Sequence, residues 1–449
     1  MTELPNGWIS TSLGAVVDYG RTEKVEPCDI RPDEWVLELE DIEKDTSTLL
    51  QKRLFSDRNP KSTKNRFAAG DILYGKLRPN LNKVILATQP GVCSTEILPL
   101  RCPEGVEPQF VFYALKRAEF LDYVTQVNHG NDMPRLGTEA GRAAALPLAP
   151  TDEQRRIVAK LDSLRTRSSR ARYELDRIPK LIERYKKAFL RAALSGDVTA
   201  AKEERTTARP DVEYDLTIRA PVSWKRLAIA DICNIVGGSQ PSKSTFCNQC
   251  KPGYVRLIQI RDYKSDKHLT YIPRSLARRF CEKNDIMIGR YGPPIFQILR
   301  GLEGAYNVAL MKAEPNTEVV HREFLYWLLQ SPDLLTYVEV ESKRTAGQDG
   351  VNKSHLLKFP VFLPEKNEQL RILYKIKHAM AWLDRITSEH TRANALLTKL
   401  DQAILARAFR GELVPQDPND EPASTLLERI AASRTTTPAK NRKQQRGEL

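Results

Sequence analysis

In two stretches of the chain, successive positions of a heptad seam lie alternately four and three residues apart without interruption. The first runs from Ile157 to Ala192, and the second runs from Ile372 to Arg407 in the same phase. Each predicts a long amphipathic helix with a narrow apolar seam. Because the seams match in length and phase, we expect them to pair as an intramolecular coiled coil, antiparallel because the chain must reverse direction. The seam residues are Ile157, Leu161, Leu164, Leu175, Ile178, Ile182, Tyr185, Phe189, Ile372, Ile376, Leu383, Ile386, Leu397, Leu400 and Ile404.

Proline and glycine place the irregularities of these helices. Pro179 lies inside the first helix, where it removes a backbone hydrogen bond, so we expect a kink or break near Ile178. The second helix carries Asn394 at the equivalent position and is expected to run straight. Gly196 and Gly411 follow the helices, where glycine can adopt the left-handed cap.

The heptads belong to a longer internal repeat. The hexapeptide Asp71–Lys76 returns as Asp285–Arg290, and Phe110–Leu115 returns as Phe324–Leu329, in both cases 214 positions later. Two copies of one unit of about 200 residues are therefore indicated. In each copy a strand-rich segment comes first, exemplified by Val84–Leu86 and Tyr254–Ile258. A helical run follows, at 110–124 and 324–338, before the long helix.

The predicted fold class is α+β, with two repeated α/β domains joined by two long helices in a pseudo-twofold, antiparallel coiled coil. The expected segments are 1–150 (first domain), 151–197 (long helix), 198–220 (linker), 221–364 (second domain), 365–412 (long helix) and 413–449 (basic tail, disordered at its end).

Composition favours a polyanionic partner. Lys and Arg exceed Asp and Glu by 70 to 57, a formal charge of +13, although part of the excess lies in the tail after Ala431.

The seven cysteines are irregularly spaced, which favours free thiols in a reducing compartment. Without a signal-like or membrane-spanning apolar run, the chain is expected to be cytoplasmic. A zinc site at Cys247 and Cys250 would need two further ligands, and we expect an ordinary loop there.

Motifs for catalysis are incomplete in this chain. The segment 237–244 approaches a phosphate-binding loop, but Ser242 replaces the glycine required before the lysine. The segment 291–296 approaches the Asn/Asp-Pro-Pro-aromatic motif of amino-methyltransferases, but Gly292 and Ile295 can neither accept from an amino group nor stack on a base. We expect no catalytic residue, no metal site and no cofactor in this chain.

Basic and amide side chains gather at equivalent places of the two copies. Arg, Gln and Asn suit hydrogen bonding to base edges, while Lys and Arg supply phosphate contacts. A basic cluster is more often only a solvated face, but two clusters in register favour DNA contact. The candidate residues are Arg66, Lys76, Arg78, Asn80 and Lys83 in the first copy, and Arg256, Gln259, Arg261, Arg290, Tyr291, Gln297 and Arg300 in the second. Arg78 and Arg290 are the preferred contacts.

Over essentially its whole length the chain resembles the specificity subunits of Type I restriction-modification enzymes. The resemblance is carried by Leu4–Trp8, by Leu148–Val158 at the start of the first long helix, and by Lys187–Gly196 and Ala403–Leu413 at the helix ends. The segment Pro422–Ile430 is typical of the tail of this family.

The resemblance implies a non-catalytic, DNA-reading subunit used in phage defence. Each target recognition domain would read one half of a split site, and the helices would act as a ruler. Two modification subunits would bring S-adenosylmethionine and methylate one adenine in each half, while restriction subunits would use ATP and Mg. The alternatives are the recognition half of a fused methyltransferase-nuclease and a coiled-coil scaffold.

Overall fold

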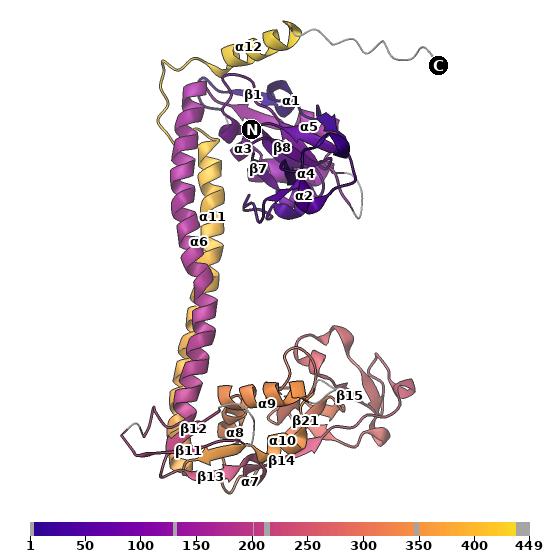
Figure 1. Ribbon diagram of the computed structural model, residues 1–449, viewed down its shortest axis with the longest axis vertical. Helices are drawn as coiled ribbons and strands as arrows, with labels where there is room; N and C mark the ends of the chain where they lie inside the picture. Colours follow the sequence, from indigo (N-terminus) through magenta and orange to yellow (C-terminus); the bar gives the residue numbers. More distant parts are fainter. Residues whose placement is uncertain (1–3, 129–132, 201, 211–215, 345–349, 437–449) are drawn as a thin grey trace. The chain divides into compact units, whose positions relative to one another are not determined.

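The computed structural model describes residues 4–128, 133–200, 202–210, 216–344 and 350–436. The chain forms two compact units: unit 1 comprises Met1–Leu175 and Arg392–Leu449, and unit 2 comprises Asp176–Thr391. The long helices α6 (Thr151–Leu194) and α11 (Lys366–Ala408) contribute to both units (Figure 1).

Unit 1 is built on short strands with helices packed around them. Its remaining elements are β1 (Ile9–Ser12), α1 (Leu13–Val16), β2 (Glu23–Val25), η1 (Pro27–Asp29), β3 (Trp35–Leu37), η2 (Leu39–Asp41), β4 (Arg53–Leu54), α2 (Phe55–Arg58), β5 (Lys64–Phe67), β6 (Ile72–Gly75), η3 (Pro79–Leu81), β7 (Val84–Leu86), β8 (Gly91–Ser94), β9 (Ile97–Leu100), α3 (Pro108–Ala114), α4 (Ala118–Val127), α5 (Thr138–Ala143), β10 (Ala145–Leu148) and α12 (Ala423–Thr436).

Unit 2 repeats most of this order. Its elements are β11 (Arg205–Ala208), β12 (Ile218–Pro221), β13 (Lys225–Ala228), α7 (Ile229–Ile232), β14 (Cys233–Gly237), η4 (Lys243–Thr245), β15 (Tyr254–Ile258), η5 (Ile260–Tyr263), η6 (Asp266–His268), β16 (Tyr271–Pro273), η7 (Arg274–Leu276), β17 (Phe280–Cys281), β18 (Ile286–Gly289), β19 (Gln297–Leu299), β20 (Gly304–Tyr306), β21 (Leu310–Pro315), α8 (Arg322–Leu328), α9 (Pro332–Arg344), α10 (Lys353–Lys358) and β22 (Pro360–Leu363).

Equivalent strands of the two units pair alike. The order β7-β6-β9 in unit 1 corresponds to β19-β18-β21 in unit 2, and the parallel pair β3-β8 corresponds to β15-β20. The pairs β1-β10 and β13-β22 join the start of each recognition segment to the strand before its long helix. The mixed α/β repeat predicted from the sequence is therefore present, and the strands expected at 84–86 and 254–258 have those bounds.

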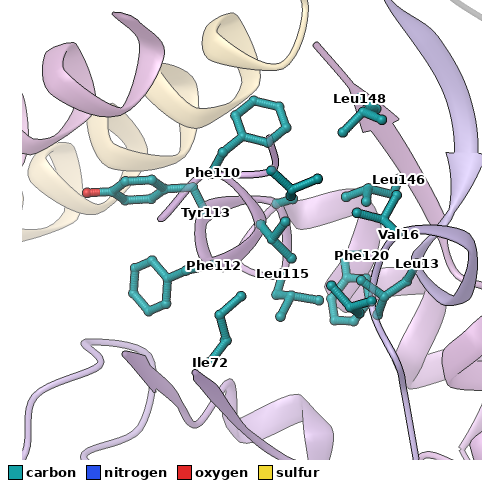
Figure 2. Packing of buried hydrophobic residues seen from close by; sticks show 14 of the residues in the cluster. Leu13, Val16, Ile72, Phe110, Phe112, Tyr113, Leu115, Phe120, Leu146 and Leu148 are labelled. Atoms are coloured by element: carbon teal, nitrogen blue, oxygen red, sulfur yellow. The ribbon is translucent and has the colours of Figure 1, made fainter. Parts of the chain in front are cut away.

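The core of unit 1 lies where the helices α3 and α4 pack on the strands. Phe110 and Phe120 are almost fully buried in one cluster with Leu13 and Ile72 (Figure 2). The ring of Phe110 lies 4.9 Å from that of Phe409, just beyond the end of α11. The end of α11 is thereby fixed to the core of this unit.

In each unit the start of one long helix packs against the end of the other. In unit 1, Asp401 of α11 accepts hydrogen bonds from Ser168 and Arg172 of α6, both at 2.7 Å. In unit 2 the rings of Tyr185 of α6 and Trp382 of α11 lie 5.4 Å apart. The helices are thus antiparallel, as the matching heptads predicted.

A glutamate near the start of each long helix binds a tryptophan of the neighbouring domain. Glu153 accepts a hydrogen bond from the indole of Trp8 at 2.9 Å, and Glu368 accepts one from Trp224 at 3.2 Å. Burial raises the pKa of the Glu153 carboxyl. Because the motif is repeated, both domains are attached to their helices in one way.

Gly196 and Gly411, with φ of +81° and +71°, follow the long helices in the left-handed conformation predicted for them. A Cβ atom at Gly196 would collide with Pro221, and one at Gly411 would collide with Pro5. Each domain therefore begins against the end of a long helix.

Two predictions about helices were wrong. The runs 110–124 and 324–338 are each two helices, α3 with α4 and α8 with α9. In the second copy Pro332 starts α9 and disfavours helical geometry at the residue before it. In the first, Arg117 is extended, and the buried Lys116 donates to the Asp45 carbonyl at 2.7 Å.

We expected a kink or a break near Ile178, and the structure leaves the kink, because α6 runs continuously from Thr151 to Leu194 with Pro179 inside it. The kink expected there stays a prediction. A single proline removes one hydrogen bond of a helix of 44 residues, and flanking turns can retain theirs.

The tail contains a helix that the sequence analysis did not anticipate. Ala423, Leu426 and Ile430 of α12 are buried in the core of unit 1, and Arg434 donates to the carbonyl oxygens of Gly14 and Ala15. The expectation of solvated disorder is therefore wrong for residues 431–436, while residues 437–449 lie outside the described part of the chain. Among the described helices, none combines the length and apolarity needed to cross a membrane.

Candidate nucleic-acid interface

The strands β6 and β18 lead into the same backbone frame in the two units. In unit 1 the Lys76 amide donates to the Glu96 carbonyl at 2.9 Å, and the Leu136 amide donates to the Lys76 carbonyl at 2.9 Å. In unit 2 the Arg290 amide donates to the Ala309 carbonyl at 2.9 Å, and Val351 donates to the Arg290 carbonyl at 3.0 Å. Lys76 and Arg290 thus occupy equivalent positions.

The candidate contacts of unit 1 fall into two groups. Arg78 and Asn80 are exposed at the turn after β6, and Arg78 has a left-handed backbone with φ of +50°. Arg66 instead pairs with Glu34 at 2.6 Å, and Lys83 donates to the Leu39 carbonyl at 2.7 Å. A phosphate or base would have to replace these partners of Arg66 and Lys83.

Several candidates of unit 2 also have contacts within the protein. The Arg290 guanidinium lies 5.2 Å from the ring centroid of Tyr291, beside the turn after β18. Gln297 donates to the Pro294 carbonyl at 2.9 Å, while Gln259 donates to Thr270 at 3.0 Å.

Three arginines complete the candidate set of unit 2. Arg256 pairs with Asp266 at 2.9 Å, and Arg300 pairs with Glu323 at 2.8 Å with its guanidinium 4.0 Å from the ring of Tyr326. Arg261 remains 55% exposed on the turn η5. Arg261 is therefore more exposed than Arg256, whose side chain is 21% exposed, while Arg290 donates to the Val308 carbonyl at 3.4 Å.

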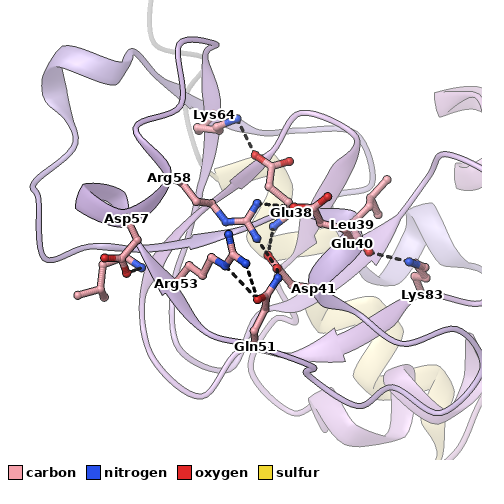
Figure 3. Close-up of polar contacts among 11 residues, drawn as sticks. Glu38, Leu39, Glu40, Asp41, Gln51, Arg53, Asp57, Arg58, Lys64 and Lys83 are labelled. Carbon is pink, nitrogen blue, oxygen red and sulfur yellow. Dashed lines mark hydrogen bonds and ion pairs between the residues drawn. The ribbon is translucent and has the colours of Figure 1, made fainter. Parts of the chain in front are cut away.

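A hollow of about 680 Å³ adjoins the turn after β6 in unit 1. Its lining includes Leu77 and Glu96 together with Glu38, Glu40 and Arg58. Figure 3 shows the last three residues with their polar contacts. Arg58 is 10% exposed, contacts the fully buried Asp41, and also binds Glu40 at 2.9 Å. The hollow is therefore lined by charged side chains whose orientations are fixed by ion pairs.

Sequence reasoning missed these acidic residues, because the search was for basic clusters. The equivalence of the two turns is visible in the structure: Asp41 accepts from the Glu38 amide at 2.8 Å, as Asp262 accepts from the Gln259 amide at 3.0 Å. This match is offset by 221 positions rather than 214, since the copies differ in length before β6 and β18.

The helix pair carries both buried and exposed apolar residues. Of the expected seam, Ile157, Leu161, Ile372, Ile376 and Leu383 are buried. Tyr185 and Leu400 are 46% and 51% exposed, although both occupy seam positions by the heptad count.

No group of three or more His, Cys, Asp or Glu side chains suited to a metal ion occurs within the described ranges. The backbone of Cys247 pairs with Tyr271 in a ladder bridge.

Comparison with known proteins agrees with this architecture. Residues 221–396 match the family described as the Type I restriction modification DNA specificity domain. The EcoBI specificity subunit of Escherichia coli is 27% identical over 398 residues, which cover 82% of this chain and 81% of the relative. Residues 221–396 therefore match a Type I DNA specificity domain, and the chain as a whole is similar to specificity subunits of Type I restriction-modification enzymes. Such subunits supply DNA sequence specificity and are not the catalytic subunits of these enzymes.

Further relatives extend over most of the chain. The StySPI specificity subunit of Salmonella potsdam is 22% identical and covers 76% of the chain and 75% of the relative. A solved chain of a type I R-M system has a TM-score of 0.70, with 22% identity, over 92% of this chain and all of its own. The HsdS subunit from Thermoanaerobacter tengcongensis has a TM-score of 0.54, with 22% identity, over 91% and 98%. At this identity the structural likeness establishes the fold alone.

Proposed function

We propose that this specificity subunit reads a bipartite DNA site, one half with each unit, and that the helix pair sets the gap between the halves. Two modification subunits bind the helices, supply S-adenosylmethionine and methylate one adenine in each half-site. Restriction subunits add ATP- and Mg-dependent translocation and cleavage. In this division of labour the present chain binds and positions, and the chemistry belongs to its partners.

The observation that carries the proposal is the duplicated frame after β6 and β18. The backbone hydrogen bonds of Lys76 recur at Arg290, so each unit presents a cation at the same place. A cation suits a polyanionic duplex, and two equivalent frames suit two half-sites. Neighbouring side chains differ between the frames, as two different half-site sequences require.

Equivalent exposed residues on the long helices support two copies of one protein partner. Leu181 and Tyr185 of α6 are 52% and 46% exposed. Leu396 and Leu400 of α11, each 215 positions later, are 56% and 51% exposed. Exposed apolar pairs one helical turn apart are typical of protein-binding surfaces.

The ruler is tested by lengthening both helices. Four residues inserted after Glu174 and four after Glu389 add ~6 Å at 1.5 Å per residue, and a four-residue insertion is absorbed as a local stutter. Because base pairs rise by ~3.4 Å, the half-sites should separate by up to about two base pairs. Methylome sequencing of a host expressing the variant with its modification subunits should show the same half-site words with a longer gap.

The matched controls are Glu174→Gln and Glu389→Gln, which leave the helix lengths unchanged and should retain the original gap. An active insertion variant that methylates sites with the original gap would contradict the ruler.

A further inference from the structure

The turns that follow β3 and β15 carry oppositely charged side chains at equivalent positions of the two units. The turn η2 presents Glu40, and the turn η5 presents Arg261. Their equivalence rests on geometry. Each turn begins after a strand in a parallel pair, and each is closed by the aspartate, Asp41 or Asp262, that accepts from the amide three residues earlier.

The packing beneath the two turns confirms the match. Leu39 lies over Gly75 at the end of β6, where a Cβ atom would be 2.8 Å from its Cδ2. Ile260 lies over Gly289 at the end of β18, where the corresponding distance to its Cδ1 is 3.3 Å. The next residues, Glu40 and Arg261, therefore stand in corresponding positions close to the frames of Lys76 and Arg290.

Both side chains are accessible. Glu40 is 70% exposed, and one of its oxygens is held by Arg58 at the rim of the hollow (Figure 3). Arg261 is 55% exposed and donates to the His268 carbonyl at 3.3 Å. Because more than half of each of these two side chains is exposed, water screens either contact, and a ligand can replace it.

The opposite charges decide what this position can contact. A position that binds phosphate in both units would need a cation in both, because a carboxylate is repelled by the DNA backbone. Base edges in the major groove can form hydrogen bonds with either a carboxylate or a guanidinium. A carboxylate accepts from the amino group of cytosine, and a guanidinium donates to O6 and N7 of guanine.

We propose that Glu40 and Arg261 are equivalent base-discriminating residues of the two units. Glu40 selects a base that offers an exocyclic amino group, cytosine by preference, in the half-site of unit 1. Arg261 selects guanine at the corresponding place in the half-site of unit 2. This inference rests on the proposed reading of one half-site by each unit.

The test uses the full chain with its modification subunits and sequences the methylome. Glu40→Gln should reduce discrimination at one base of the unit 1 half-site on the order of tenfold and leave the other half-site unchanged. Glu40→Arg should convert the preferred base at that position to guanine. Arg261→Gln should relax one base of the other half-site only.

Glu139→Gln is the matched control, because Glu139 is also an exposed, arginine-paired glutamate of unit 1, with 90% exposure. This variant should leave both half-site sequences unchanged. If the Glu40 and Arg261 variants methylate the wild-type words at wild-type rates, the inference is wrong while the proposed function stands. If the wild-type complex methylates no bipartite site, the proposed function itself fails. Arg261→Gln decides the question alone if the Glu40 variants do not fold.

Discussion

Replacing Gln369 with leucine should loosen the attachment of α11 to unit 2. The Gln369 side chain is fully buried. Its Oε1 accepts from the His321 amide at 2.8 Å, and its Nε2 donates to the carbonyl oxygens of Val319 at 3.0 Å and Pro364 at 2.9 Å. One side chain thus joins α11 to the start of α8 and to the segment that follows β22.

The cost follows from the partners left behind. Leucine has a similar volume, so little cavity forms, but the His321 N–H and two carbonyl oxygens lose their partner. A hydrogen bond contributes about 1 kcal/mol net, and an unsatisfied buried group costs about 1–3 kcal/mol. We expect the free energy of unfolding of unit 2 to fall by about 3 kcal/mol. For a unit of this size that lowers the melting temperature by about 6–12 °C.

Scanning calorimetry measures the loss, and hydrogen exchange of the α8 and α11 amides locates it in unit 2. Gln154 is the internal comparison: it donates to the Ala149 carbonyl at 2.8 Å and accepts from the Glu107 amide at 2.9 Å. With two bonds rather than three, Gln154→Leu should cost about 2 kcal/mol, in unit 1. The control is Gln402→Leu at an exposed position of α11. If Gln369→Leu destabilises the protein no more than this control, the anchoring role is refuted.

Two further changes test the packing of unit 1. Leu426→Ala in α12, at a side chain 1% exposed, should cost about 2–5 kcal/mol and lower the melting of unit 1 alone, whereas Glu428→Ala at an exposed position should have no such effect. Burial and the neighbouring Arg165 lower the pKa of Lys116 from 10.5 to about 7, so unfolding takes up a proton between these values and stability should rise with pH from about 7 to 10.5. Lys116→Met should reduce this rise of the free energy of unfolding with pH, measured from unfolding curves at several pH values. An unchanged rise would mean that another group causes it.

Local patterns accounted for much of the fold. The heptads located α6 and α11, because a seam repeated over many turns has few alternative explanations. Positive φ at Gly196 and Gly411 was predictable because glycine adopts it without a Cβ clash. These features depend on residues close together in the chain.

The candidate interface was less accessible to sequence reasoning. The search for basic clusters included Arg66, Arg256 and Arg300 among the candidates beside the preferred Arg290. The first three are paired with carboxylates brought from elsewhere in the fold, among them Glu34 and Glu323. The importance of Glu40 was hidden for the same reason, since its equivalence to Arg261 depends on packing against glycines in other strands.

The division of the chain into units explains why domain boundaries were harder to predict than repeats. Each sequence copy ends with its own long helix, but antiparallel pairing places the end of α6 in unit 2 and the end of α11 in unit 1. The segment after α11 must then complete the domain made by the first residues of the chain. There the Ala423 amide donates to the Gly7 carbonyl at 2.8 Å, and Arg156 binds Asp420. A linear reading treats residues after 413 as a tail, whereas the paired helices return them to the first domain, where burial of α12 gives them a structure.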